Sequence, residues 1–174
     1  MKSSTVLPPD RKQLLICRHA KSSWDDTAQN DVERSLNKRG RRDAVEMGRR
    51  LAERGLLPDL ILASHATRAW TTAEAYANQL GYSLDRIQVD PALYTATSAS
   101  LLALVRGLEP HLGRVLLVGH NPECTAFATQ LGDPDIMSVP TSGIVAFEFH
   151  TLSWQEVLLG QGQLLFFDFP KNAA

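Results

Sequence analysis

The stretch that most constrains this chain is residues 14–21, in which four apolar residues run directly into an arginine and a histidine. The apolar run at 14–17 has the length of a buried strand and is too short for most helices. In an open α/β sheet, ligands bind at the carboxyl ends of the strands. At such an end Arg18 could hold an oxyanion, and His19 could act as a nucleophile or a base. The alternative is a solvent-exposed strand end, and this stretch alone leaves both interpretations open.

Two further apolar runs end in the same way. The run at 60–63 leads to His65, and the run at 115–118 leads to His120. Arg68 follows in the first turn of an expected helix, where the helix dipole disfavours a cation. Its position is explained if Arg68 and the free amides of that turn share one anion. Helical patterns separate the three runs, so a mostly parallel sheet would bring their ends to one edge.

This alternation predicts an α/β fold, a three-layer sandwich with a mostly parallel central sheet and helices on both faces. Helices are expected between an Asn37 cap and Gly55, over 67–80, from a Ser98 or Ser100 cap through Leu108, and over 123–131. Further strands are expected at 87–89, 144–149 and 163–169. Residues 1–12 are interpreted as a flexible N-terminal arm, and 13–170 as a single domain.

Composition excludes several classes of function. A net charge of -1 over 174 residues gives no reason to expect nucleic acid or a membrane as a partner. No apolar run approaches membrane-spanning length, and the N-terminus lacks the apolar region of a signal peptide. The two cysteines have neither a zinc-site spacing nor a disulfide framework. A monomer in the reducing cytoplasm is therefore expected.

The expected sheet edge gathers two arginines and at least two histidines in one crevice. No cluster of carboxylates accompanies them, which speaks against a metal site. Guanidinium groups beside imidazoles suit a tetrahedral dianion such as phosphate.

In chain order, the motifs are Arg18-His19, then Arg68-Ala69 with residues 72–74, and then the segment GHNP at 119–122. This order resembles the histidine phosphatase superfamily, which has the phosphoglycerate-mutase-like fold. Within it, the chain looks closest to the SixA-type phosphohistidine phosphatases. That closer resemblance depends on RHAKSSW at 18–24, RSLNKRG at 34–40 and PTSG at 140–143, and the whole resemblance covers residues 14–149.

The resemblance implies a role for each of these positions. His19 would be the nucleophile that takes the phosphoryl group, Arg18 and Arg68 would hold its oxygens, and His120 would complete the cationic pocket. Substrate contacts are implied for Arg34 and Thr141, although Arg34 could equally be a solvated loop residue. Neighbouring positive charge would keep His19 neutral and nucleophilic near pH 7. Water would then hydrolyse the phosphohistidine intermediate, so no cofactor and no metal are expected.

The chain departs from the family where a proton donor is usual. Many relatives carry a glutamate in the segment that matches residues 93–96, or an aspartate directly after the second histidine, whereas this chain has Thr95 and Asn121. A departing alkoxide needs a proton, but a phosphoramidate such as phosphohistidine can be protonated on nitrogen beforehand. The absence of an acid at these two positions favours a P–N substrate. Glu123 and Asp26 are left as possible proton donors.

The sequence therefore predicts a phosphoric monoester or phosphoramidate hydrolase that dephosphorylates phosphohistidine in a protein. Two alternatives stay open: a general phosphomonoesterase of small molecules, and a module that binds phosphate or phosphoproteins with negligible turnover. A binding module has no need of a nucleophile, so His19 favours an enzyme. A mutase is disfavoured because the short loops leave little room to reorient a phosphosugar. The substrate protein and its pathway are not specified by the sequence.

Overall fold

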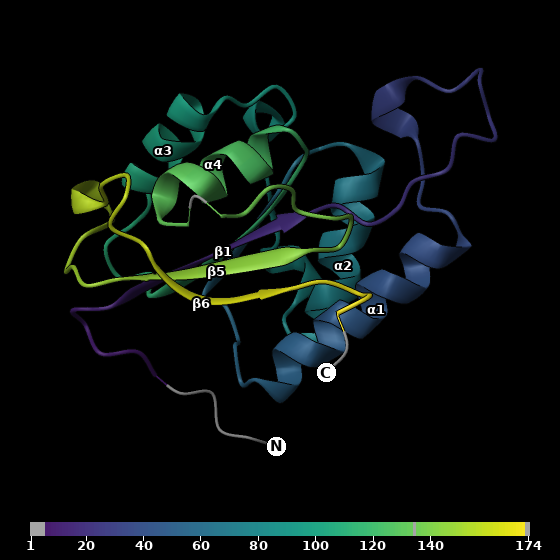
Figure 1. The fold of residues 1–174 in the computed structure, drawn as a ribbon. Coiled ribbons are helices and arrows are strands. Elements are labelled where there is room, and N and C mark those ends of the chain that lie inside the picture. The colour runs from purple at the N-terminus through teal and green to yellow at the C-terminus, as the bar shows by residue number, and fades with distance from the viewer. Residues whose placement is uncertain (1–5, 134, 173–174) are drawn as a thin grey trace.

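The computed structural model describes residues 6–133 and 135–172 and has one six-stranded sheet at its centre (Figure 1). The strands are β1 (Lys12–Arg18), β2 (Leu60–Ala63), β3 (Gln88–Val89), β4 (Arg114–Gly119), β5 (Ile144–Phe149) and β6 (Gln163–Asp168). Their order across the sheet is β3-β2-β4-β1-β5-β6. The first four strands are mutually parallel, β5 pairs antiparallel with β1, and β6 pairs antiparallel with β5. The predicted mostly parallel sheet is confirmed.

Helices cover both faces of this sheet, α1 and α2 on one and α3 and α4 on the other (Figure 1). Their bounds are α1 (Lys38–Glu53), α2 (Thr67–Leu80), α3 (Ser98–Arg106) and α4 (Glu123–Leu131). Strand β1 serves both layers, because alternate side chains of a strand point to opposite faces. Leu14 and Ile16 join the core under α3 and α4, while Leu15 and Cys17 join the core under α1 and α2.

Most helix ends follow from local sequence. The side chain of Asn37 accepts a hydrogen bond from the Gly40 amide and begins α1, as expected. Gly81, with φ +66°, ends α2 in the left-handed conformation that glycine adopts at low cost. The expected Ser98 or Ser100 cap of α3 is wrong. Thr97 caps this helix in a capping box: its hydroxyl accepts from the Ser100 amide, and the Ser100 hydroxyl accepts from the Thr97 amide.

The long segment between β1 and α1 is fixed close to the end of β1. Ser22 forms an isolated bridge with Leu36, and the Asn37 amide donates to the carbonyl of Lys21. A Cβ at Gly40 would meet that same carbonyl oxygen at 2.1 Å, so only glycine lets α1 begin this close to β1. The segment, which includes the short 3-10 helix Asp31–Glu33, is therefore anchored beside the carboxyl end of the sheet.

Of the expected N-terminal arm, residues 1–5 lie outside the described residues, and Val6 is exposed. Among the helices of the described residues, none is both long and apolar enough to cross a membrane.

Candidate active site

The carboxyl ends of β1 and β4 and the first turn of α2 bring three side chains together. His19 follows β1, His120 follows β4, and their ring centroids lie 5.1 Å apart. Arg68, in the first turn of α2, donates from Nε to the Nε2 atom of His19 at 3.3 Å. All three are buried, with exposed fractions of 8% for His19, 7% for His120 and 5% for Arg68. These residues form the base of a small cationic pocket.

The tautomer of His19 follows from its hydrogen bonds. The Nδ1 atom lies 2.7 Å from the carbonyl oxygen of Ala20, and a carbonyl can only accept, so Nδ1 carries the proton. The Nε2 atom is therefore unprotonated, and its lone pair accepts the hydrogen bond from Nε of Arg68. Burial lowers the pKa of His19 to about 4; the Ala20 hydrogen bond opposes this shift, and the charges of three nearby arginines add to it. The sequence analysis attributed the neutral state to charge, whereas desolvation is the larger cause.

His120 is held by a hydroxyl from the neighbouring strand end. Its Nε2 atom lies 2.8 Å from Oγ of the buried Ser64, and that hydroxyl oxygen also accepts from the Ala66 amide. If the hydroxyl hydrogen is donated to Nε2, the proton of the neutral ring lies on Nδ1. Burial lowers the pKa of His120 to about 3, and the adjacent His19 lowers it further. His120 is thus neutral at pH 7, and in this tautomer its buried Nδ1–H is an unused hydrogen-bond donor.

Three buried polar atoms at or near the site lack partners. Among the described residues, Nε of Arg18, Nδ1 of His120 and Oγ of Ser142 are buried without a hydrogen bond. Arg18 itself is held through Nη1, which donates to the carbonyl of Val139 at 3.1 Å. An unpaired buried polar atom costs about 1–3 kcal/mol. An oxyanion that accepts from Arg18 and His120 would remove that cost.

Sequence reasoning missed two residues of this site. The Asp31 carboxylate accepts from Nη2 of Arg68 at 2.9 Å and from the hydroxyl of Tyr94 at 2.6 Å. Its backbone carbonyl accepts from Nη1 of Arg68 at 2.6 Å. The Tyr94 ring meets the ring of His120 edge-on, with centroids 5.4 Å apart. Asp31 is thus an anionic partner of Arg68, whereas an anion shared by Arg68 and the free amides of α2 stays a prediction.

The two predicted substrate contacts are placed differently. Arg34 is buried rather than solvated; it pairs with Asp31 at 2.9 Å and donates to the hydroxyl of Ser22 at 2.9 Å. Its guanidinium also stacks on the exposed ring of Trp24, 3.6 Å from the ring centroid. Thr141 is half-buried in the turn before β5, and no contact in the described part of the chain joins its side chain to His19 or His120.

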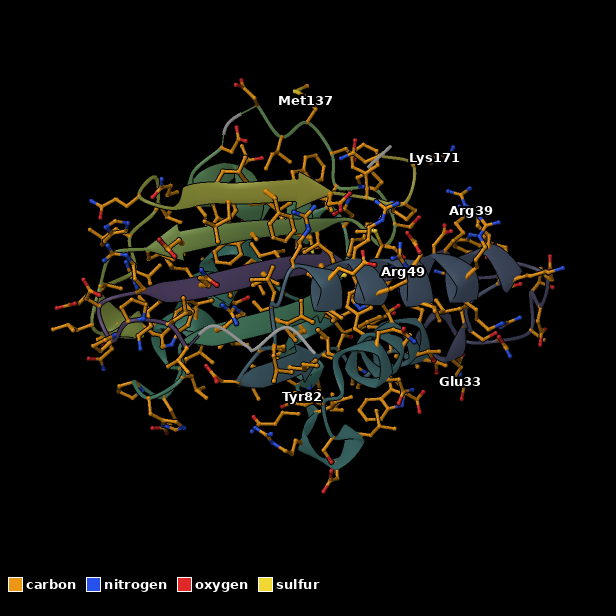
Figure 2. All side chains as sticks on the ribbon, turned by 90° about the horizontal axis from the view of Figure 1, so that it is seen from below. Glu33, Arg39, Arg49, Tyr82, Met137 and Lys171 are labelled. Carbon is orange, nitrogen blue, oxygen red and sulfur yellow. The ribbon has the colours of Figure 1, made fainter. Side chains whose placement is uncertain are left out.

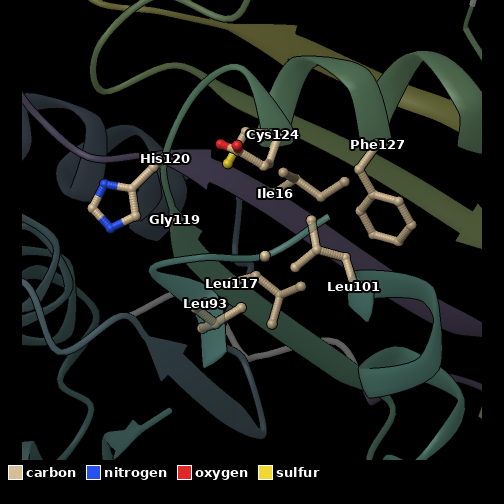
Figure 3. A pocket seen from close by; sticks show the side chains of 10 residues that line it. Ile16, Leu93, Leu101, Leu117, Gly119, His120, Cys124 and Phe127 are labelled. Carbon is tan, nitrogen blue, oxygen red and sulfur yellow. The ribbon is translucent and has the colours of Figure 1, made fainter. Parts of the chain in front are cut away.

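The two carboxylates expected as possible proton donors, Glu123 and Asp26, have different surroundings. Glu123 lines an apolar pocket with Cys124 and Phe127, under α4 (Figure 3). His120 stands at the edge of that pocket (Figure 3). Asp26 is exposed, and its carboxylate accepts from the Ala28 amide. Asp31 is the carboxylate that contacts the arginines of the site.

The site combines the lone pair of His19 Nε2 with the fixed positive charges of Arg18 and Arg68. Within residues 6–133 and 135–172, no group of three or more His, Cys, Asp or Glu side chains is placed to hold a metal ion. The unprotonated Nε2 atom of His19 faces Arg68, and the charge of Arg18 also lowers the pKa of His19. This arrangement can hold a tetrahedral oxyanion and attack its central atom.

The two buried histidines predict an acid-labile fold. In the unfolded chain these imidazoles take up protons as the pH falls through 6.5, whereas in the folded chain they stay neutral until about 4 for His19 and 3 for His120. The unfolded state binds more protons in that interval, so the free energy of unfolding falls with falling pH. One pKa unit corresponds to about 1.4 kcal/mol, which predicts a loss of roughly 3 kcal/mol or more.

Urea unfolding between pH 7 and pH 4 measures this loss. The variant His120→Gln, which cannot titrate at this position, should show a visibly shallower dependence on pH. An equal slope in both proteins would contradict the buried neutral state of His120.

Comparison with known proteins gives a family match and similar folds. Residues 14–94 match the model of the histidine phosphatase superfamily, branch 1. An uncharacterized chloroplastic protein of Arabidopsis thaliana is 29% identical over 159 residues, which are 87% of this chain and 72% of the relative. A structure from Agrobacterium tumefaciens, assigned as the phosphohistidine phosphatase SixA, is 28% identical and has a TM-score of 0.76, covering 90% of this chain and 97% of that one. The protein histidine phosphatase SixA complexed with tungstate, 23% identical, shares the fold with a TM-score of 0.74 over 92% of this chain and 98% of its own.

Proposed function

Because residues 14–94 match the histidine phosphatase superfamily and the chain resembles a SixA structure in fold and sequence, we propose that its pocket removes the phosphoryl group from phosphohistidine in a protein, through a covalent intermediate on His19. The observation that carries the proposal is the neutral imidazole of His19, whose Nε2 lone pair faces Arg68. A pocket built only to bind an anion would need the cations but not an unprotonated, oriented nitrogen beside them.

The first step is an in-line displacement at phosphorus. The lone pair of His19 Nε2 forms the new N–P bond, and the bond to the leaving atom breaks with its electron pair going to that atom. Arg18, Arg68 and His120 donate to the three equatorial oxygens as charge builds on them. His19 becomes positively charged in this step, and the Ala20 carbonyl stabilises the new cation through the Nδ1 proton.

The second step is hydrolysis of the phosphohistidine. A water oxygen attacks phosphorus, the N–P bond breaks, and its electron pair returns to Nε2 of His19. Both hydrogens of the water leave with the inorganic phosphate as the monoanion, so His19 regains its starting tautomer. The same donors hold the phosphoryl oxygens in both steps, and no further group is consumed.

A P–N substrate is supported by the residues in the usual acid positions. Thr95 is exposed, and the side-chain amide of Asn121 donates to the Val139 carbonyl. Neither side chain is an acid that could protonate a departing alkoxide. The similarity to SixA phosphohistidine phosphatases also supports a phosphorylated protein as the partner.

Single-turnover labelling tests the proposal against the alternative of a binding module. A peptide carrying [³²P]phosphohistidine is mixed with excess enzyme, and label on the protein and in free phosphate is followed with time. We expect transient, acid-labile label on His19 that gives way to inorganic phosphate. Label that stays on His19, or tight binding without transfer, would favour the binding module. Release from nitrophenyl phosphate alone would favour the general phosphomonoesterase.

Arg34 provides a separate prediction about substrate binding. Its guanidinium shares Asp31 with Arg68 and supports the exposed Trp24 ring at the surface. We expect Arg34→Ala to raise KM more than it lowers kcat, because Arg34 contacts Asp31 and Trp24 rather than His19 and acts on how substrate is held. Steady-state kinetics measure this split, with Arg39→Ala on the exposed face of α1 as the matched control. A fall in kcat alone would contradict a binding role.

A further inference from the structure

Asp31 lies at the mouth of the pocket rather than at its base. Its side chain is 48% exposed, whereas His19 and His120 are buried. The Arg68 guanidinium connects the two levels, since Nε reaches His19 and Nη2 reaches the Asp31 carboxylate. In an in-line displacement the leaving atom is opposite the attacking atom. A group that leaves as His19 attacks from the base therefore departs toward the mouth, past Asp31.

The mouth carries a fixed negative charge among aromatic rings. Hydrogen bonds from Tyr94, Arg68 and Arg34 lower the pKa of Asp31 to about 2, so its carboxylate is ionised at every physiological pH. The Tyr94 hydroxyl is committed to Asp31, and its ring stands against the exposed ring of His65, with centroids 5.3 Å apart. Aromatic faces and a carboxylate together suit a flat cation.

We propose that Asp31 is a specificity-determining residue. It favours substrates whose leaving group is cationic before the P–N bond breaks, namely the protonated imidazole ring of a phosphohistidine side chain, over substrates with a neutral or anionic leaving group. This inference rests on the proposed function and adds the reason for its substrate preference. Protonation of the ring nitrogen that does not carry phosphorus makes the ring a good leaving group. When the P–N bond breaks, its electron pair neutralises the ring, which departs as imidazole with that proton still bound.

The charges at the mouth of the pocket explain why the Asp31 carboxylate affects substrate preference. Arg34 and Arg68 both face this region, and Asp31 is the carboxylate that ion-pairs with both of them among the described residues. With Asp31 ionised, the positive potential is strongest at the base, where the phosphoryl oxygens bind, and weaker at the mouth. Neutralising Asp31 would extend the positive potential outward, which repels a cationic ring and attracts an anionic leaving group such as nitrophenolate.

The experiment compares two substrates in matched charge variants. Asp31→Asn removes the charge and keeps the shape; Asp31→Glu keeps the charge. Glu33→Gln removes one negative charge from an exposed residue in the same short helix and serves as the control. Figure 2 shows Glu33 at the same end of the molecule as Arg39 in the first turn of α1. For each protein, kcat/KM is measured on a phosphohistidine peptide and on nitrophenyl phosphate.

We expect Asp31→Asn to lower the ratio of phosphohistidine to nitrophenyl phosphate kcat/KM by about tenfold, and Asp31→Glu to recover most of it. Glu33→Gln should keep the wild-type ratio. The decline of phosphohistidine turnover at alkaline pH, where the substrate ring loses its proton, should also begin at lower pH in Asp31→Asn. The groups that face Asp31 there are Arg34, Arg68 and Tyr94, with His65 and His120 behind the tyrosine ring.

Two results would overturn the inference in distinguishable ways. Equal losses on both substrates in Asp31→Asn would show that Asp31 only positions the arginines, while the proposed function would stand. A wild-type enzyme that hydrolyses nitrophenyl phosphate but not the phosphohistidine peptide would overturn the proposed function and this inference together.

Discussion

Replacing His19 with alanine is expected to abolish turnover, with a loss of kcat on the order of 10⁴-fold or more, because no other group at the base of the pocket offers an oriented lone pair. The substitution should leave the fold in place. The His19 ring lies at a strand end and hydrogen-bonds only to Ala20 and Arg68 among the described residues, outside the two apolar cores. Loss of the covalent label should accompany loss of turnover.

The measurement is single-turnover release of phosphate, with circular dichroism to verify folding. His150→Ala is the matched control, since His150 is exposed and follows β5 at the opposite edge of the sheet. Turnover by His19→Ala within tenfold of the wild type would exclude His19 as the nucleophile. In the wild type, activity should persist as the pH falls toward the His19 pKa of about 4, and decline below it, because protonation removes the attacking lone pair.

The second large effect concerns leaving groups. Thr95 and Asn121 occupy the usual acid positions, Glu123 lines the apolar pocket, and the Asp31 carboxylate is ionised. No carboxylic acid among them is set to protonate a departing alkoxide. Simple alkyl phosphates should therefore react more slowly than nitrophenyl phosphate or phosphohistidine by the 10²–10⁴-fold, roughly, that general acid catalysis usually contributes.

A series of aryl and alkyl phosphates of graded leaving-group pKa measures this effect as the slope of kcat/KM. The pH profile with alkyl phosphates should also lack a descending limb from a carboxylic acid. A flat dependence on leaving-group pKa would mean that a donor operates, and Glu123→Gln and Asp26→Asn would then identify it. A donor that survives both substitutions would point to Tyr94, the hydroxyl nearest the mouth.

The sequence alone determined the elements and the positions of the main site residues. Helix α2 and strand β5 have the bounds expected from the sequence, 67–80 and 144–149. Arg18, His19 and His120 could be assigned because Arg18 ends a buried strand and each histidine directly follows one, so their placement depends only on local sequence and on the parallel order of the strands. The family resemblance then supplied their implied roles.

Tertiary structure decided which charges meet and which atoms are protonated. Asp31 lies in an irregular segment without periodicity, and its partners Arg68 and Tyr94 are 37 and 63 residues away, a pairing that no local pattern encodes. The neutral state of His19 depends on desolvation and on one backbone carbonyl, which exist only once the sheet and helices have closed around it. The ends of strands can therefore be predicted from the sequence, because buried apolar residues recur periodically along the chain. Charge pairing across a pocket cannot, because it depends on distances between residues that only the folded chain determines.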